Sequence, residues 1–152
     1  MNDTLIIGFG NTLRGDDGAG VIAAGRIGKA NPAVDCLLLQ ELYPETADAI
    51  AGRRRVVFID AAVGIDAFSI EPVAAVPGPA RPSSHSLTPA GLLRLSEDLS
   101  GQSTEAILAR IPAFRFDFGE GLSSGAGAAV DECVARIGSL IASSSGRDRR
   151  DG

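Results

Sequence analysis

The sequence has few of the residues that usually carry nucleic-acid, redox or metal chemistry. Its 152 residues include one histidine, two cysteines and no tryptophan, and only one of its 14 basic residues is a lysine, Lys29. The net charge is −5, and the only basic run before the C-terminal tail is RRR at 53–55, which indicates a solvated loop ahead of a strand. Nucleic-acid binding depends on clustered cations that neutralise phosphates, so this composition argues against it.

Long apolar runs and export signals are also missing. No run approaches the roughly 20 apolar residues that a membrane-spanning helix needs, and the first residues lack the basic segment and apolar core of a secretory signal. We therefore expect a cytoplasmic protein without membrane contact. Cys36 and Cys133 form no C-x-x-C pair and lie among apolar residues, which predicts buried structural thiols.

The pattern of apolar runs predicts a single α/β domain. Hydrophobic residues make up 45% of the chain, and 152 residues are enough for one sizeable core. The β-α-β-α-β order at the start implies parallel strands with right-handed crossovers, and Pro72 places the fourth strand at an edge or a bulge. Residues 114–118 alternate and indicate a short strand or an extended segment. Strands are expected at 5–7, 34–39, 56–60, 68–76 and 106–111, and helices at 17–30, 44–51, from 88 onward and at 124–142.

The expected fold is therefore a three-layer arrangement, with a mostly parallel, twisted five-stranded sheet and helices on both faces. The domain spans residues 1–142, and the polar segment 143–152 is predicted to be a disordered tail.

The segment TLIIGFGNTLRGDDGAG at 4–20 joins the first strand to the first helix through a glycine turn that carries two acids. Such turns often bind phosphate. Here the third glycine of the dinucleotide fingerprint is replaced by Leu13, and Gly15 is followed by Asp16 and Asp17 instead of Lys-Ser/Thr. Two carboxylates would repel a pyrophosphate and attract a cation.

Titratable side chains follow several of the predicted strands. Asp16 and Asp17 come after the first strand and Asp60 closes the third, so these acids should meet where parallel strands end. His85, the only histidine, precedes the third helix and reaches the same rim if the fourth strand runs parallel. One imidazole and two carboxylates suit zinc or nickel and leave coordination positions open. The simpler interpretations are a helix cap, a strand-end acid and a surface histidine.

Other catalytic arrangements have weaker support. The serines around His85, with Asp60, suggest acyl transfer, but the chain has no G-x-S-x-G elbow. It also has no H-E-x-x-H zinc-protease motif.

The motif Gly8-x-Gly10-Asn11-x-Leu13-x-x-Asp16-Asp17-Gly18-x-Gly20, the strand ending at Asp60, and Ser84-His85 before a helix resemble the hydrogenase maturation endopeptidases. The segment GEGLS at 119–123 also resembles that family. The resemblance runs over about residues 4–142. It implies a cytoplasmic protease that removes a short C-terminal extension from the precursor of the [NiFe] hydrogenase large subunit, after nickel has entered that precursor.

By the same resemblance, Asp17, Asp60 and His85 are the residues that touch the metal. Nickel would come with the substrate, and zinc or another divalent ion can substitute. The carboxylates of Asp16, Asp17 and Asp60 are the catalytic candidates, with their individual roles open.

The loop after the second strand departs from many relatives. It reads QELYPE at 40–45 where those relatives have a glycine-rich loop, which leaves open which hydrogenase is served. Gly10, Asn11 and Glu41 are the candidates for substrate binding. One alternative is a Rossmann-like nucleotide-binding module with Glu41 on a ribose. Another is a nickel-sensing or scaffold protein that does not hydrolyse peptides.

Overall fold

The computed structural model describes residues 1–78 and 87–150, with side chains through residue 144. A five-stranded sheet has the order β2-β1-β3-β5-β4, in which β2, β1, β3 and β5 are parallel and β4 pairs antiparallel with β5. The strands are β1 (Thr4–Phe9), β2 (Asp35–Leu39), β3 (Arg55–Ala62), β4 (Ser69–Pro72) and β5 (Glu105–Pro112). The helices are η1 (Gly15–Gly18, one 3-10 turn), α1 (Ala19–Ala30), α2 (Thr46–Ile50), α3 (Pro89–Ser100) and α4 (Ser124–Arg150).

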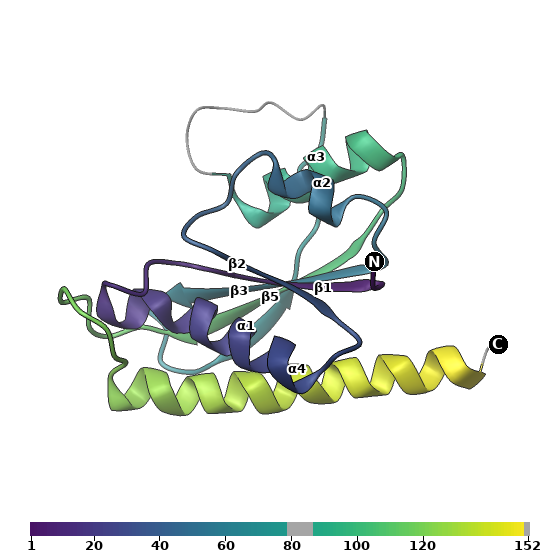
Figure 1. Ribbon diagram of the computed structural model, residues 1–152. Helices are drawn as coiled ribbons and strands as arrows, with labels where there is room; N and C mark the ends of the chain where they lie inside the picture. Colours follow the sequence, from purple (N-terminus) through teal and green to yellow (C-terminus); the bar gives the residue numbers. More distant parts are fainter. Residues whose placement is uncertain (79–86, 151–152) are drawn as a thin grey trace.

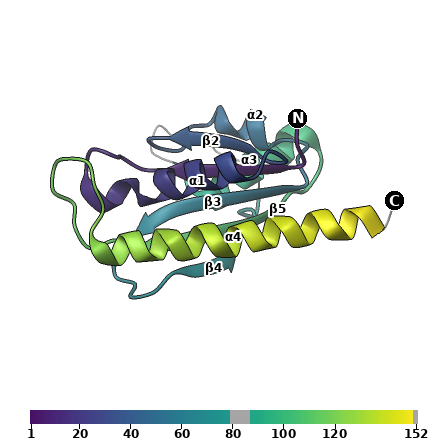
Figure 2. The same ribbon diagram turned by 60° about the horizontal axis from the view of Figure 1, so that its bottom comes forward.

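Helices cover both faces of the sheet, which confirms the predicted three-layer fold. Helices α1 and α4 lie on one face, and α2 and α3 lie on the other (Figures 1 and 2). Side chains alternate along each strand, so Ile6 of β1 packs into the α1/α4 core while its neighbours Leu5 and Ile7 pack into the α2/α3 core. Cys133 is buried in the α1/α4 core, as expected, and the half-buried Cys36 packs against it.

Strand β4 has the predicted edge position but not the direction that would place His85. It ends at Pro72, which fits the rule that confines proline to sheet edges. Because β4 runs antiparallel to β5, the chain leaves it at the end of the sheet opposite the other carboxyl ends. The fourth strand is therefore not parallel, although the predicted place of His85 at the carboxyl rim required a parallel strand there. His85 itself lies outside the described residues.

Helix α3 supplies a different route to the carboxyl rim. A short connection, residues 101–104, leads from α3 into β5, and Glu105 N–H donates to the carbonyl of Arg54 at the start of β3 (3.0 Å). Helix α3 thus ends beside the amino ends of the strands, and its first residues lie toward their carboxyl ends (Figure 1). Thr88 caps it as predicted, with its hydroxyl oxygen accepting from Gly91 N–H at 3.1 Å.

Two further predictions concern the C-terminal segment and residues 114–118. Helix α4 continues through Arg150, so residues 143–150, predicted as a disordered tail, are helical (Figure 2). The Arg55 guanidinium donates a hydrogen bond to the Ser144 hydroxyl. Residues 114–118, predicted as a short strand or an extended segment, form no strand, and the neighbouring Gly119 forms an isolated bridge to Arg14. No helix in the described ranges has the length and apolar character that crossing a bilayer would require.

Candidate functional site

The glycines of the first turn allow β1, η1, α1 and β3 to pack closely together. At Gly20 in the first turn of α1, a Cβ atom would lie 2.4 Å from the carbonyl oxygen of Ile59 in β3. At Gly10, φ is +143°, and a Cβ would lie 2.0 Å from the carbonyl oxygen of Asp17. These glycines therefore bring the acid-bearing turn against the end of β3. Packing accounts for them, and nothing in their contacts supports the nucleotide-binding alternative.

Asp17 is held beside the glycine turn by its own carboxylate. Its Oδ2 accepts a hydrogen bond from Asn11 N–H at 2.8 Å, while Asn11 Oδ1 accepts from Leu13 N–H at 2.9 Å. The side chain of Asp17 makes no hydrogen bond that caps η1 or α1, so the simple cap interpretation is wrong. Its carboxylate is half-buried at the carboxyl end of β1.

Asp60 has a raised pKa and lies at the same rim. It lies within β3, which continues two residues beyond the predicted end, and it is half-buried. Burial raises the pKa of Asp60 to about 6, and the negative charge of Asp17 adds to the rise. A hydrogen bond from Ala61 N–H and the positive charge of Arg110 oppose it. The two carboxylates thus lie near enough to repel each other, as convergence at the carboxyl rim predicts.

Asp16 has a different environment from its neighbour. It is fully buried, and its carboxylate accepts four hydrogen bonds. Phe114 N–H and Arg115 N–H donate to Oδ2 at 2.8 and 3.0 Å. Ser123 donates its N–H to Oδ1 at 2.7 Å and its hydroxyl to Oδ2 at 2.6 Å. Burial would raise the pKa of Asp16, but these hydrogen bonds outweigh it and lower that pKa.

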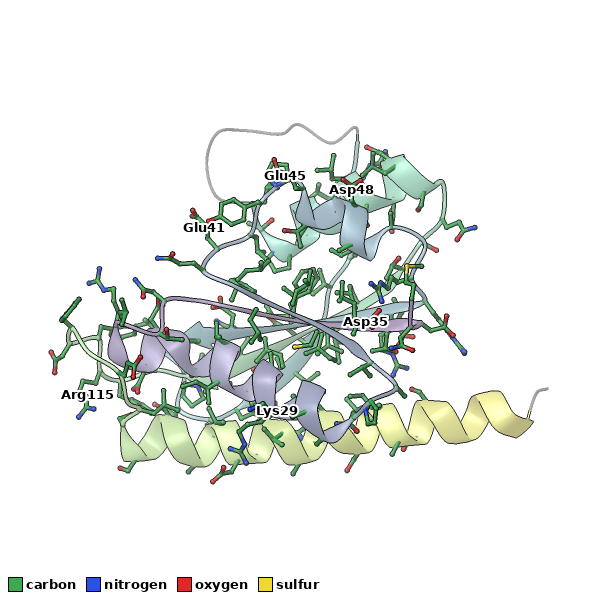
Figure 3. All side chains as sticks on the ribbon, in the orientation of Figure 1. Lys29, Asp35, Glu41, Glu45, Asp48 and Arg115 are labelled. Carbon is green, nitrogen blue, oxygen red and sulfur yellow. The ribbon has the colours of Figure 1, made fainter. Side chains whose placement is uncertain are left out.

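Asp16 therefore anchors the loop 113–123 to the glycine turn. Main-chain bonds support the same contact: Gly119 N–H donates to the Leu13 carbonyl at 2.7 Å, and Asp16 N–H donates to the Arg115 carbonyl at 2.8 Å. Figure 3 shows Arg115 on this loop, near the start of α4. Both oxygens of Asp16 are engaged, so the geometry favours a structural role, and Asp17 and Asp60 remain the catalytic candidates.

Sequence reasoning gave Ser123 no role, although it noted the segment that contains it. Its two hydrogen bonds to Asp16 join residues 107 positions apart. The local signal was the GEGLS segment ahead of α4, which marks a turn but does not identify its partner.

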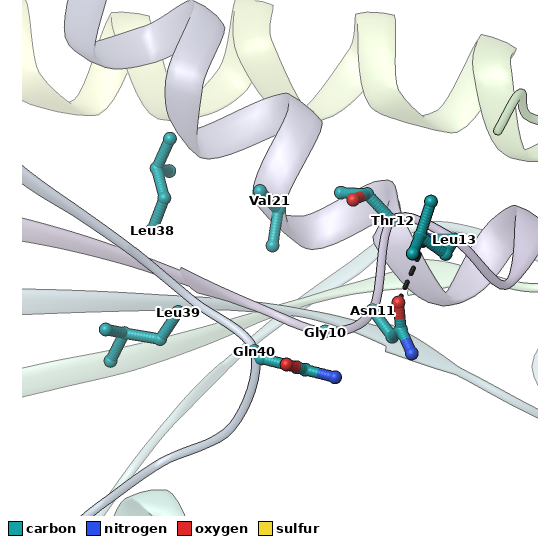
Figure 4. Close-up of a pocket in the computed structure, with 8 residues that line it drawn as sticks. All are labelled: Gly10, Asn11, Thr12, Leu13, Val21, Leu38, Leu39 and Gln40. Atoms are coloured by element: carbon teal, nitrogen blue, oxygen red, sulfur yellow. Dashed lines mark hydrogen bonds between the residues drawn. The ribbon is translucent and has the colours of Figure 1, made fainter.

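A groove of 310 Å³ opens between the carboxyl ends of β1 and β2, and Asn11, whose N–H donates to Asp17, lines it. Figure 4 shows Val21 and Leu38 on one side of the sheet, and Asn11 and Gln40 on the other. The predicted substrate-binding residues Gly10 and Asn11 line this groove. Glu41 is exposed on the loop that leads to α2 (Figure 3) and follows Gln40 directly. The lining consists of Gly10, Asn11, Thr12, Leu13, Val21, Leu38, Leu39 and Gln40.

Of the three predicted metal ligands, Asp17 and Asp60 lie at the same rim, near enough for the charge of Asp17 to raise the pKa of Asp60. The third, His85, lies outside the described residues, as do Ser83, Ser84 and Ser86. Two carboxylates can bind a divalent ion through oxygen while leaving most of its coordination positions to other ligands.

No family model and no curated protein matches the sequence. Among solved structures, the chain is similar to the hydrogenase maturating endopeptidase HybD from Escherichia coli, with a TM-score of 0.69 and 16% identity over 95% of this chain and 94% of that one. It is also similar to two [NiFe] hydrogenase maturation proteases from Thermococcus kodakarensis. For the HybD protein of Thermococcus kodakarensis the TM-score is 0.66 and the identity 23%, over 92% of this chain and 99% of that one. For HycI from Thermococcus kodakarensis KOD1 the TM-score is 0.64 and the identity 28%, over 92% of this chain and 90% of that one. The resemblance predicted from the sequence is thus confirmed in the fold of nearly the whole chain.

Proposed function

We propose that this protein is the endopeptidase that removes the C-terminal extension from a nickel-loaded precursor of the [NiFe] hydrogenase large subunit. The observation that carries the proposal is the pairing of Asp17 and Asp60 at one rim of the sheet, with Asp60 raised to a pKa of about 6. This pair sits on the fold of solved hydrogenase maturation proteases.

The donor set suits a metal ion that arrives bound to the substrate. Two carboxylates alone hold a divalent ion weakly, but they add ligands to an ion that the precursor already coordinates. In this proposal Asp17 and Asp60, with His85 as the third ligand, contact the nickel of the precursor, and zinc or another divalent ion can take its place. Cleavage would then depend on nickel loading, because the ion positions the scissile bond.

The remaining chemistry belongs to the carboxylates. A general base works best when its pKa lies near the working pH. In the metal-free protein burial raises the pKa of Asp60 to about 6, and contact with the nickel of the precursor would lower it again. A water molecule oriented by the pair adds to the scissile carbonyl and gives a proton to a carboxylate. That proton then passes to the leaving amine. Asp17 holds its position through the Asn11 N–H bond to one of its oxygens.

The groove next to the pair is the proposed contact with the chain being cut. Gly10 and Asn11 would contact the main chain of the precursor near the scissile bond. Glu41, exposed beyond the groove, would contact a residue farther along. The loop carrying Glu41 would help to decide which hydrogenase is processed.

The test compares two forms of one precursor. Purified protein is mixed with nickel-loaded large-subunit precursor and, in parallel, with the same precursor purified without nickel, and intact masses are followed over time. We expect the nickel-loaded form alone to lose its C-terminal extension. If neither form is shortened although the protein binds the loaded one, the non-hydrolytic scaffold is the correct description.

A further inference from the structure

Strand β2 leaves one side of its backbone open at the sheet edge. It pairs only with β1, and no segment in the described ranges pairs with its other side. Its side chains are also incompletely covered, and Leu38 is 51% exposed. Open edges are templates for the addition of another strand, and proteins commonly protect them with charge, proline or a covering segment. Residues 36–39 are CLLL and contain none of these charges or prolines.

The direction of each backbone group on β2 follows from one hydrogen bond. Gly10 N–H donates to the carbonyl of Leu39 at 3.0 Å, so the polar backbone groups of Leu39 face β1. Because backbone groups alternate along a strand, those of Leu37 also face β1, and those of Cys36 and Leu38 face the open edge. At the amino end of β2, the carboxylate of Asp35 accepts a hydrogen bond from Asn2 N–H at 3.0 Å.

The open edge leads into the groove between the carboxyl ends of β1 and β2. Leu38 and Gln40 line that groove on the β2 side, and Asn11, whose N–H holds Asp17, lines it on the β1 side (Figure 4). Strands lie about 4.8 Å apart, so an added strand would run about 14 Å from β3, which carries Asp60. An extended chain covers that distance in about four residues.

We infer that the edge of β2 binds the C-terminal extension of the precursor as an added antiparallel strand. This inference rests on the proposed function. The scissile bond lies at Asp17 and Asp60, and the residues after it cross the groove. They then run toward the amino end of β2, which makes them antiparallel to it. Main-chain bonds to Leu38 and Cys36 give affinity that depends little on sequence, while the groove selects an apolar side chain.

Amide exchange tests the alternation directly. The probe is a synthetic peptide with the sequence of the precursor's C-terminal extension, added to the isotopically labelled full-length protein, and exchange is measured for each amide by NMR. In the free protein we expect the amides of Cys36 and Leu38 to exchange fast and those of Leu37 and Leu39 to exchange slowly. With peptide, we expect exchange of Cys36 and Leu38 to slow by about tenfold or more. Unchanged exchange of both at millimolar peptide overturns the inference.

Two variants at Leu38 test the same surface in the cleavage reaction. Leu38→Pro removes an outward donor that the β1–β2 ladder does not use, and proline is tolerated at such edge positions. Leu38→Glu puts a charge into the groove, and Leu99→Glu, at a site that is 57% exposed on α3, is its matched control. We expect both Leu38 variants to raise KM about two- to tenfold with kcat unchanged, Leu38→Pro through the lost main-chain hydrogen bond and Leu38→Glu through the charge in the groove, while Leu99→Glu keeps the wild-type KM.

The outcomes separate this inference from the proposed function. Suppose that the wild type cleaves nickel-loaded precursor, and that both Leu38 variants melt like the wild type and have the same KM. The edge of β2 then does not bind the extension, and the proposed function stands. If the wild type cleaves no precursor, the proposed function is wrong. The exchange experiment then decides by itself whether the edge binds this peptide.

Discussion

Replacing Asp60 by Asn should make the protein more stable while it removes activity. The folded protein holds Asp60 at a pKa of about 6 against an ordinary value of 3.8, mainly because the carboxylate is buried. A shift of about two units corresponds to about 3 kcal/mol of unfavourable free energy when the group is charged. Asn has the same shape, carries no charge, and can accept the Ala61 N–H bond.

The pH dependence fixes the sign of this effect. The raised pKa means that folding favours protonated Asp60, so the wild type has no penalty below pH 3.8 and loses stability as the pH rises through about 6. Relaxation and nearby water reduce the full value, and we expect Asp60→Asn to gain about 1–3 kcal/mol at pH 8 and close to nothing at pH 3.5. For a chain of this size, that is a rise of about 3–10 °C in Tm at pH 8.

Urea unfolding of both proteins at the two pH values measures the gain. Asp117→Asn, at an exposed acid of the 113–123 loop, is the control and should change stability by less than about 0.5 kcal/mol. A gain of the same size at both pH values would show that burial of charge is not its cause. A loss of stability at pH 8 would refute the reasoning outright.

The other predictions concern packing and anchoring. Asp16→Asn replaces a buried carboxylate that accepts four hydrogen bonds and turns an amide N–H toward donors. The free energy of unfolding, measured in urea, should fall by about 2–4 kcal/mol, and proteolysis within 113–123 should become faster. Equal stability would contradict the anchoring role. Gly20→Ala should destabilise by about 1–3 kcal/mol or more through its clash with β3, whereas Gly127→Ala, with open space in α4, should gain about 0.5–1 kcal/mol. Their thermal melts should move in opposite directions. Thr88→Ala should lower stability by about 1 kcal/mol through loss of the α3 cap, and an unchanged melt would argue against that cap.

The layers of the fold could be predicted because local patterns determine them. Apolar runs and the β-α-β order were enough for the sheet and its helices. The direction of β4 was also available in principle: residues 63–68 are too few for the crossover that a parallel strand would need. Helix α4 extended farther than its serine- and arginine-rich end indicated, because a helix already formed is cheap to extend.

The site was predicted only in part, since some of its contacts are not local. The carboxyl-edge rule brought Asp17 and Asp60 together, and the structure places both at that rim. Adjacent Asp16 and Asp17 have the same side chain, and their separation into anchor and catalytic candidate depends on Ser123, which lies 107 residues beyond Asp16. No periodicity or spacing in the sequence reports such a contact.

Processing of nickel-loaded precursor by single variants of the rim tests the central claim most directly. Initial cleavage rates are compared for Asp17→Ala, Asp60→Ala and His85→Ala, with Asp117→Ala as the matched exposed control and thermal melts to show that each protein is folded. The account predicts that the first three fold but do not cleave, and that Asp117→Ala cleaves at the wild-type rate. Normal cleavage by folded Asp17→Ala or Asp60→Ala would contradict it.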